Sequence, residues 1–99
     1  MDRETLTPLI GRCRAGDELA WEAFVRQVQG RVYALAYSYL NDREEARDLA
    51  QEIFVRLYET RDRWPGDAEF VPWLIHVARN RSVDYLRRRK ARVLSSALP

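Results

Sequence analysis

Cysteine, histidine, glycine and proline are all scarce in this sequence. Cys13 is the single cysteine among 99 residues, so neither an intrachain disulfide nor a cage of cysteine ligands is available. His76 is the single histidine, and no Glu-x-x-His pair occurs, which excludes a carboxylate-bridged metal site with two imidazoles. Nucleophile-elbow and phosphate-loop patterns are missing as well. The sequence therefore predicts no catalytic residue, no metal site and no cofactor, and it does not favour an enzyme.

Long apolar runs are absent too. The N-terminal residues MDRETLTPLIGRCRAG contain no apolar signal segment, and no later run approaches the roughly 20 apolar residues that a membrane span requires. We therefore expect a cytoplasmic protein without a membrane span. A hydrophobic share of 46% and a length of 99 residues fit one globular domain with a modest core.

What the sequence does have is helical periodicity, and the alternation typical of strands is missing. We expect an all-α, compact bundle of about four helices. The first runs over about 5–15 and ends at Gly16, and Asp17 caps the second. Asn41 with Glu44 has the form of a capping box and opens the third, which runs to about residue 60. Residues 61–69 form a loop, and the fourth helix covers about 69–90.

Apolar residues three and four positions apart define the faces that these helices should bury. For the second helix they are Leu19, Ala20, Phe24, Val28, Val32, Leu35, Ala36 and Tyr39; for the third they are Ala46, Leu49, Ala50, Ile53, Phe54 and Leu57. Pro72 is tolerable if it falls in the first turn of the fourth helix. The domain should span residues 1–94, and residues 95–99 should begin an interdomain linker or a disordered tail.

Charge is strongly segregated along the chain, although the net charge is only +2. Residues 1–40 hold five charges of each sign, residues 41–69 hold five basic and nine acidic residues, and residues 70–99 hold seven basic and one acidic. This asymmetry predicts two surfaces with different partners. The acidic surface suits a basic protein patch, and the basic surface suits phosphate or anionic lipid.

The fourth helix carries two stripes. The first is apolar except for one arginine and consists of Phe70, Leu74, Val77, Ala78, Arg81 and Tyr85. The second consists of Trp73, His76, Asn80, Asp84 and Arg87. An aromatic ring, an amide and cations along one edge suit stacking on bases, reading of base edges and phosphate contact.

Plainer interpretations of the same residues remain open. Trp73 borders the apolar stripe and can simply be buried, and His76 can be an ordinary surface residue. The basic run from Arg87 to Arg92 can be a solvated helix end that favours cations through the helix dipole. Arginine is, however, the cation best suited to bind phosphate, so a dense arginine cluster favours phosphate contact.

Two blocks carry a resemblance to a known family. They are DLAQEIFVRLYE at 48–59 and FVPWLIHVARNRSVDYLRRRKAR at 70–92, and their separation adds specificity. Together they strongly resemble region 2 of bacterial RNA polymerase sigma factors of the extracytoplasmic-function group, over about residues 19–92. The resemblance implies a compact helical domain that takes part in transcription initiation.

In that family, the helix with the D-L-x-Q-E pattern docks on the clamp helices of the β′ subunit of RNA polymerase core. The matching positions here are Asp48, Leu49, Gln51 and Glu52, with Val55 and Tyr58 as neighbours. The charge pattern agrees, because Glu45, Asp48 and Glu52 share one face of a helix where like charges destabilise it. An external basic partner would relieve that repulsion, although a solvated acidic face is the plainer alternative.

The resemblance also implies that the last helix and the loop before it recognise the −10 promoter element and hold its non-template single strand. Trp73, Asn80 and Asp84 match on the helix, and Asn80 is the leading candidate for reading a base edge, with His76 beside it. The candidates for backbone contact are Arg61, Arg63, Arg79, Arg87 and Arg88. Trp64 either packs the loop, which we favour, or wedges against bases. An anti-sigma factor is a further partner known in the family.

Complete factors of this group continue into a second helical domain that reads the −35 element. We therefore expect this chain to be a fragment that binds polymerase and −10 DNA but supports promoter-specific initiation poorly. The main alternative is a non-specific basic helical module that binds RNA or anionic membrane through its C-terminal cluster. Such a module has no use for an acidic D-L-x-Q-E surface, so the third helix distinguishes the two hypotheses.

Overall fold

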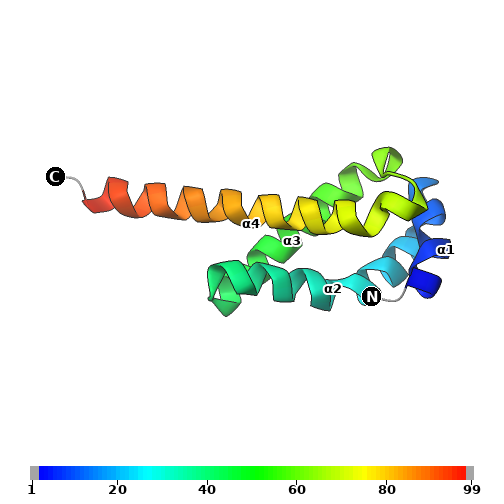
Figure 1. Cartoon of the computed structure of the whole chain (residues 1–99), viewed down its shortest axis with the longest axis horizontal. Coiled ribbons are helices and arrows are strands. Elements are labelled where there is room, and N and C mark those ends of the chain that lie inside the picture. Colours follow the sequence, from blue (N-terminus) through cyan, green and yellow to red (C-terminus); the bar gives the residue numbers. More distant parts are fainter. Residues whose placement is uncertain (1–2, 98–99) are drawn as a thin grey trace.

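The computed structural model describes residues 3–97, which form four α-helices, one short 3-10 helix and no strand (Figure 1). The helices are α1 (Arg3–Arg14), α2 (Glu18–Leu40), α3 (Arg43–Glu59) and α4 (Asp67–Ala97), and the 3-10 helix η1 (Arg61–Arg63) lies in the loop before α4. The expected all-α bundle is confirmed. Helix α2 packs against α1, α3 and α4, and α4 runs along the length of the molecule, as Figure 1 shows.

The turn between α1 and α2 forms as its sequence predicts. Gly16 adopts a φ of 91°, a left-handed conformation that glycine accepts without a steric penalty, and it ends α1. Asp17 caps α2, since its Oδ1 accepts hydrogen bonds from the N–H groups of Leu19 and Ala20 at 3.0 and 3.2 Å. Those bonds, together with the Arg12 guanidinium at 2.9 Å, hold the pKa of Asp17 below its ordinary value.

The capping box that we expected at Asn41 and Glu44 is wrong by one residue. Asn41 ends α2 instead, with a left-handed φ of 52°, and its N–H donates to the carbonyl of Tyr37 at 2.8 Å. Asp42 is the cap of α3, and its Oδ1 accepts from the N–H of Glu45 at 2.9 Å. Both Asn and Asp suit a helix start, but Asn also tolerates the left-handed region. Asn41 therefore occupies the C-terminal cap of α2, and Asp42 starts α3.

The core is a layer of apolar side chains from all four helices. Helix α2 buries Ala20, Phe24, Val28, Val32, Ala36 and Leu40, and α3 buries Ala46, Leu49, Ala50, Ile53 and Leu57. Leu19, which the periodicity assigned to the core, is instead 71% exposed. Cys13 is buried, and burial raises the pKa of its thiol to about 11, which makes it a poor nucleophile.

Helix α4 differs from the expectation at both ends. It begins at Asp67, so Pro72 lies in the second turn and cannot donate to the carbonyl of Ala68, an exposed residue of the first turn. It continues to Ala97, beyond the expected end near Lys90, and the helix therefore includes most of the segment that we expected to be a linker. Leu98 and Pro99 lie outside the described residues.

The buried face of α4 consists of Phe70, Leu74, Ala78 and Ser82, one residue every four positions. The hydroxyl of Ser82 donates to the carbonyl of Ala78 at 2.8 Å, which satisfies the only buried polar side chain among the described residues. Val77, Arg81 and Tyr85 from the expected stripe are half-buried beside this line. Within residues 3–97, no helix combines the length and the apolar character that crossing a membrane requires.

Candidate functional site

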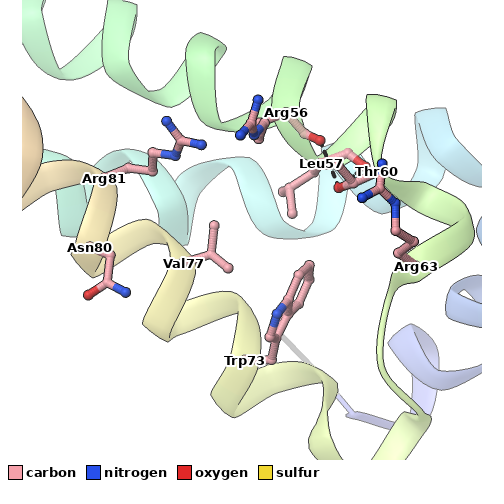
Figure 2. A pocket seen from close by; sticks show the side chains of 8 residues that line it. All are labelled: Arg56, Leu57, Thr60, Arg63, Trp73, Val77, Asn80 and Arg81. Atoms are coloured by element: carbon pink, nitrogen blue, oxygen red, sulfur yellow. Dashed lines mark hydrogen bonds between the residues drawn. The ribbon is translucent and has the colours of Figure 1, made fainter.

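A pocket of about 320 Å³ lies between α3 and α4 (Figure 2). Its residues come from α3, from the loop that follows it and from the middle of α4: Arg56, Leu57, Thr60, Arg63, Trp73, Val77, Asn80 and Arg81. In Figure 2 the indole of Trp73 and the side chain of Val77 point from α4 into the space below α3. The pocket therefore has apolar walls and a polar rim.

Three guanidinium groups surround this pocket, from Arg56, Arg63 and Arg81. Among the described residues, no carboxylate lies within ion-pair distance of any of them. Three cations around one pocket repel one another, and an anion bound between them would relieve that repulsion. Arginine presents a planar fork of donors that matches a phosphate, so the rim is suited to a phosphodiester.

Trp73 is half-buried, and its indole both packs against the core and lines the pocket. Its ring centroid lies 5.6 Å from that of Phe70, which is buried in the core, while the same indole lines the pocket. The ring is thereby supported on one side by the core. An aromatic ring supported in this way can stack a base without losing much side-chain freedom.

Asn80 is exposed at the edge of the pocket, and its amide interacts with the neighbouring turn of α4. The Nδ2 of Asn80 lies 3.0 Å from the Nε2 of His76, one turn earlier. No side chain or backbone group among the described residues donates to the carbonyl oxygen of Asn80, so this oxygen remains available to accept a hydrogen bond. A free carbonyl oxygen matches the exocyclic amine of adenine or cytosine.

The remaining cations of α4 differ in how strongly they are engaged. Arg79 and Arg87 are exposed and have no acidic partner among the described residues. Arg88 lies 3.4 Å from Asp84 and 3.8 Å from Glu52, and its guanidinium carbon is 5.6 Å from the ring centroid of Tyr85. Asp84, expected at the DNA surface, is thus paired with an arginine of its own helix.

Trp64 is part of the core and offers no face to DNA. It is 2% exposed, and its Nε1 donates to the carbonyl of Leu57 at 3.0 Å. Its ring centroid lies 4.9 Å from both Phe24 and Phe70. The sequence left two roles open for Trp64, and the structure shows the one that we favoured, packing of the loop. The alternative, in which Trp64 wedges against bases, is wrong because the ring is buried.

Arg61 is held by its own protein, although we expected it to contact DNA backbone. Its NH1 donates to Glu18 at 3.0 Å, and its guanidinium carbon lies 3.8 Å from the ring centroid of Tyr58. The hydroxyl of Tyr58 also donates to Glu18, at 2.9 Å to Oε1. The bonds from Arg61 and Tyr58 lower the pKa of Glu18, and the bond to Glu18 raises the pKa of Arg61.

The outer side of α3 carries the residues that we expected to bind polymerase. Asp48, Gln51, Glu52 and Val55 are exposed, and Val55 is 57% exposed, which is high for an apolar residue. Leu49 is completely buried in the core, so its expected contact with a partner is corrected: it supports the helix from within. The exposed positions are three and four residues apart and therefore share one face.

An apolar groove of about 810 Å³ continues this face between α2 and α3. It is lined by Trp21, Val25, Gln29, Gln51, Phe54, Val55, Tyr58 and Glu59. Gln51, Val55 and Tyr58 belong to both the groove and the expected polymerase face. The groove and the exposed side of α3 thus form one surface, with an apolar part and an acidic part.

The acidic residues on this side of α3 are partly neutralised from within. Glu45 forms an ion pair with Arg89, whose NH1 also donates to the carbonyl of Leu40 at 3.3 Å. Glu52 is near Arg88, whereas Asp48 has no basic partner among the described residues. The sequence indicated three like charges on one face, whose repulsion an external basic partner would relieve; in the structure, Glu45 is instead paired with α4, and Asp48 is the carboxylate of the three without a basic partner among the described residues.

Sequence reasoning did not identify Arg56, Thr60 or Arg81 as part of a site. Arg81 did carry a signal, because it interrupts an apolar stripe where a hydrophobic residue would be expected. Arg56 and Thr60 lack such a signal, since their approach to α4 depends on how α3 and α4 pack against each other. Trp21 and Val25 of the groove were likewise indistinguishable from core residues.

Comparison with known proteins agrees with this architecture. The sequence pattern of Sigma-70 region 2 matches residues 24–92, which include most of α2, all of α3 and η1, and α4 up to Arg92. A four-helix domain with this match is a sigma factor region 2 domain, and the chain belongs to the Sigma-70 region 2 family.

Relatives narrow the family to one group. The chain is 39% identical over 88 residues to the ECF RNA polymerase sigma factor SigE of Mycolicibacterium smegmatis, covering 85% of this chain and 33% of that protein. It is 33% identical over 81 residues to the ECF RNA polymerase sigma factor SigW of Bacillus subtilis, and the match covers 82% of this chain and 43% of that protein. It is 32% identical over 78 residues to the RNA polymerase sigma-H factor of Pseudomonas aeruginosa, and the match covers 79% of this chain and 40% of that protein. The domain is thus of the extracytoplasmic-function (ECF) type, and it spans less than half the length of these relatives.

Proposed function

We propose that this domain acts in transcription initiation, binding RNA polymerase core with one surface and the non-template strand of a −10 promoter element with another. The polymerase surface is the outer side of α3 with the α2–α3 groove, and its partner is the β′ subunit. The DNA surface is the α3–α4 pocket with the exposed cations of α4. The relatives are named as RNA polymerase sigma factors, and we extend that role to this chain.

The observation that carries the proposal is the composition of the α3–α4 pocket. Three arginines with no acidic partner among the described residues surround an indole that the core supports, and an asparagine lies at the edge, its carbonyl oxygen without a donor in this part of the chain. Each part has a distinct task in binding a single strand. The guanidinium groups neutralise phosphates, the indole stacks an unpaired base, and the amide reads a base edge. A base must leave the duplex to reach this pocket, which is why the site favours an opened strand.

The opposite surface has the properties of a protein interface. The groove is apolar and contains aromatic side chains, and Asp48 on the same side of α3 has no basic partner within the described part of the chain. Apolar and aromatic residues dominate the centre of protein interfaces, and charges at the edge guide association with a complementary patch. A basic helical partner would fit both parts.

Two measurements test the proposal. The tagged domain is mixed with RNA polymerase core, and retention on the core is measured by pull-down. The retained complex then selects from a pool of single-stranded oligonucleotides with a randomised central segment, and a recovered sequence is compared with its shuffled version. We expect retention on core and a preference of at least about tenfold for the selected sequence, the value of one good base contact.

Three outcomes would contradict the proposal in different ways. Loss of retention on core would remove the polymerase surface. Equal binding to selected and shuffled strands, with affinity set by salt alone, would identify a non-specific basic module instead. Tight binding to anionic vesicles at the same salt concentration would favour a membrane surface.

A further inference from the structure

The loop between α3 and α4 is fixed at both of its ends, and Arg63 lies between the two fixed points. At the first end, Arg61 is stacked on Tyr58 and bonded to Glu18, which comes from the first turn of α2. At the second end, Trp64 is buried between Phe24 and Phe70 and bonded to the carbonyl of Leu57. Backbone bonds from Arg63 to Thr60 at 2.9 Å and from Trp64 to Arg61 at 3.2 Å close the turn between them.

The two arginines of this turn are in opposite situations. The side chain of Arg61 is 20% exposed, and both its charge and its ring face are engaged by Glu18 and Tyr58. Arg63 is exposed, has no acidic partner among the described residues and lines the α3–α4 pocket. Arg61 is thus occupied with holding the loop, whereas Arg63 is available to a ligand.

Glu18 holds this arrangement together. Its carboxylate accepts from Arg61 and from the hydroxyl of Tyr58, and the latter bonds lie at 2.9 and 3.0 Å. These contacts join residues 40 and 43 positions apart in the sequence. No other carboxylate among the described residues pairs with Arg61.

We propose that Glu18 is a positioning residue for DNA binding, acting through Tyr58 and Arg61 to keep Arg63 at the α3–α4 pocket. This inference rests on the proposed function of that pocket. A loop fixed before its ligand arrives does not have to be ordered during binding, and the affinity increases by that saving in entropy. Neither Glu18 nor Arg61 touches the nucleic acid in this arrangement.

The test uses Glu18→Gln in the full chain, with Glu22→Gln as a matched control. Glu22 is an exposed carboxylate one turn further along α2 that has no partner among the described residues. We expect Glu18→Gln to weaken binding of the selected −10 strand about threefold to tenfold, the range for loss of preorganisation in one loop. Glu22→Gln should leave binding unchanged, since it alters the same net charge without touching the loop.

A double-mutant cycle separates positioning from a general structural effect. If Glu18 acts through Arg63, then Glu18→Gln should cost little further affinity in an Arg63→Ala background. An equal loss in both backgrounds would overturn the inference. So would tighter binding by Glu18→Gln, because it would mean that Arg61 is itself a DNA contact that Glu18 restrains.

Hydrogen exchange gives a readout that does not depend on DNA. The amides of Arg63 and Trp64 should exchange faster in Glu18→Gln, while the core amides of α2 and α4 keep their rates. Unchanged exchange at these two amides would overturn the inference even if the domain prefers its −10 strand. If exchange accelerates but the parent domain shows no sequence preference, the proposed function fails, and the role of Glu18 in DNA binding fails with it.

Discussion

The two surfaces on either side of α3 differ in charge although they share one helix. The groove towards α2 is lined by apolar, aromatic and amide side chains with one carboxylate and no cation. The pocket towards α4 is lined by three arginines and no carboxylate. Adjacent residues of α3, such as Val55 and Arg56, belong to opposite surfaces. The rotation of about 100° per residue along a helix is thus enough to give α3 an apolar groove on one side and a basic pocket on the other.

The strongest test of this division reverses charge on the outer side of α3. Asp48→Arg combined with Glu52→Arg should reduce retention on polymerase core by about 100-fold or more, because like charges then face each other across the interface. The helical signal should remain, since both positions are exposed. Pull-down at fixed salt measures the loss.

A matched control changes the same number of charges elsewhere. Glu22→Arg with Glu44→Arg alters exposed carboxylates outside the groove and the pocket, and should leave retention within about twofold. If the Asp48 and Glu52 variant is retained as well as this control, then α3 does not form part of the polymerase interface.

A second test separates the interior of the D-L-x-Q-E segment from its surface. Leu49→Ala deletes a completely buried side chain and should lower the free energy of unfolding by about 2–5 kcal/mol, from lost burial and the cavity left behind. Gln51→Ala, on the exposed side of the same turn, should change it by less than about 0.5 kcal/mol. Urea titration followed by circular dichroism measures both. Similar stability of the two variants would contradict the burial of Leu49.

The sequence alone predicted the helices and their approximate extent, because helix periodicity and the turn residues are local. Gly16 and Asp17 correctly predicted the first turn. Phe24, Val28 and Val32, four positions apart, correctly predicted a core face of the second helix. The one-residue error at Asn41 arose because Asn and Asp both suit helix ends, and only the preceding helix decides between them. The extension of α4 past Lys90 was missed because a polar helix end has no apolar period to follow.

The partners of individual charges could not be predicted, because they depend on distances between helices. Residues Glu18 and Arg61 are far apart in the sequence, and nothing local in either indicates the pairing. The same holds for Glu45 and Arg89, whose ion pair removed one carboxylate from the expected acidic face. Arg81 differs from these residues, because its place can be inferred without knowing a partner. An arginine within an apolar stripe already indicates a polar opening beside the core.

A third test addresses how the pocket divides affinity from sequence preference. Asn80→Ala should reduce the preference for the selected strand over its shuffled version by about 1–3 kcal/mol, since it removes the amide that we propose reads a base edge. Arg81→Gln should instead weaken both strands alike and lower the salt slope by about 0.7, the value for one phosphate contact on a single strand. Fluorescence anisotropy over a salt series measures both quantities. If Arg81→Gln loses sequence preference and Asn80→Ala does not, then Arg81 rather than Asn80 reads the base, and the proposed assignment is wrong.

The smallest expected effect concerns the ion pair that ties α2 to the loop. The bonds from Arg61 and Tyr58 hold the pKa of Glu18 below its ordinary value of 4.5, so the folded domain favours the ionised carboxylate. That stabilisation is complete above the ordinary value and is lost as pH falls through the lower pKa of the folded state. The difference in melting temperature between the parent domain and Glu18→Gln should therefore be constant from about pH 8 to about pH 5.5 and shrink below about pH 4.

Glu22→Gln provides the control for that pH series, because no hydrogen bond or ion pair holds Glu22 among the described residues. Its melting temperature should differ little from that of the parent domain at each pH. If the Glu18→Gln difference stays constant down to the lowest pH at which the parent domain is folded, then the charge of Glu18 contributes nothing. Neutral hydrogen bonds to Tyr58 and Arg61 would then hold the loop, because a protonated carboxyl can still accept from both.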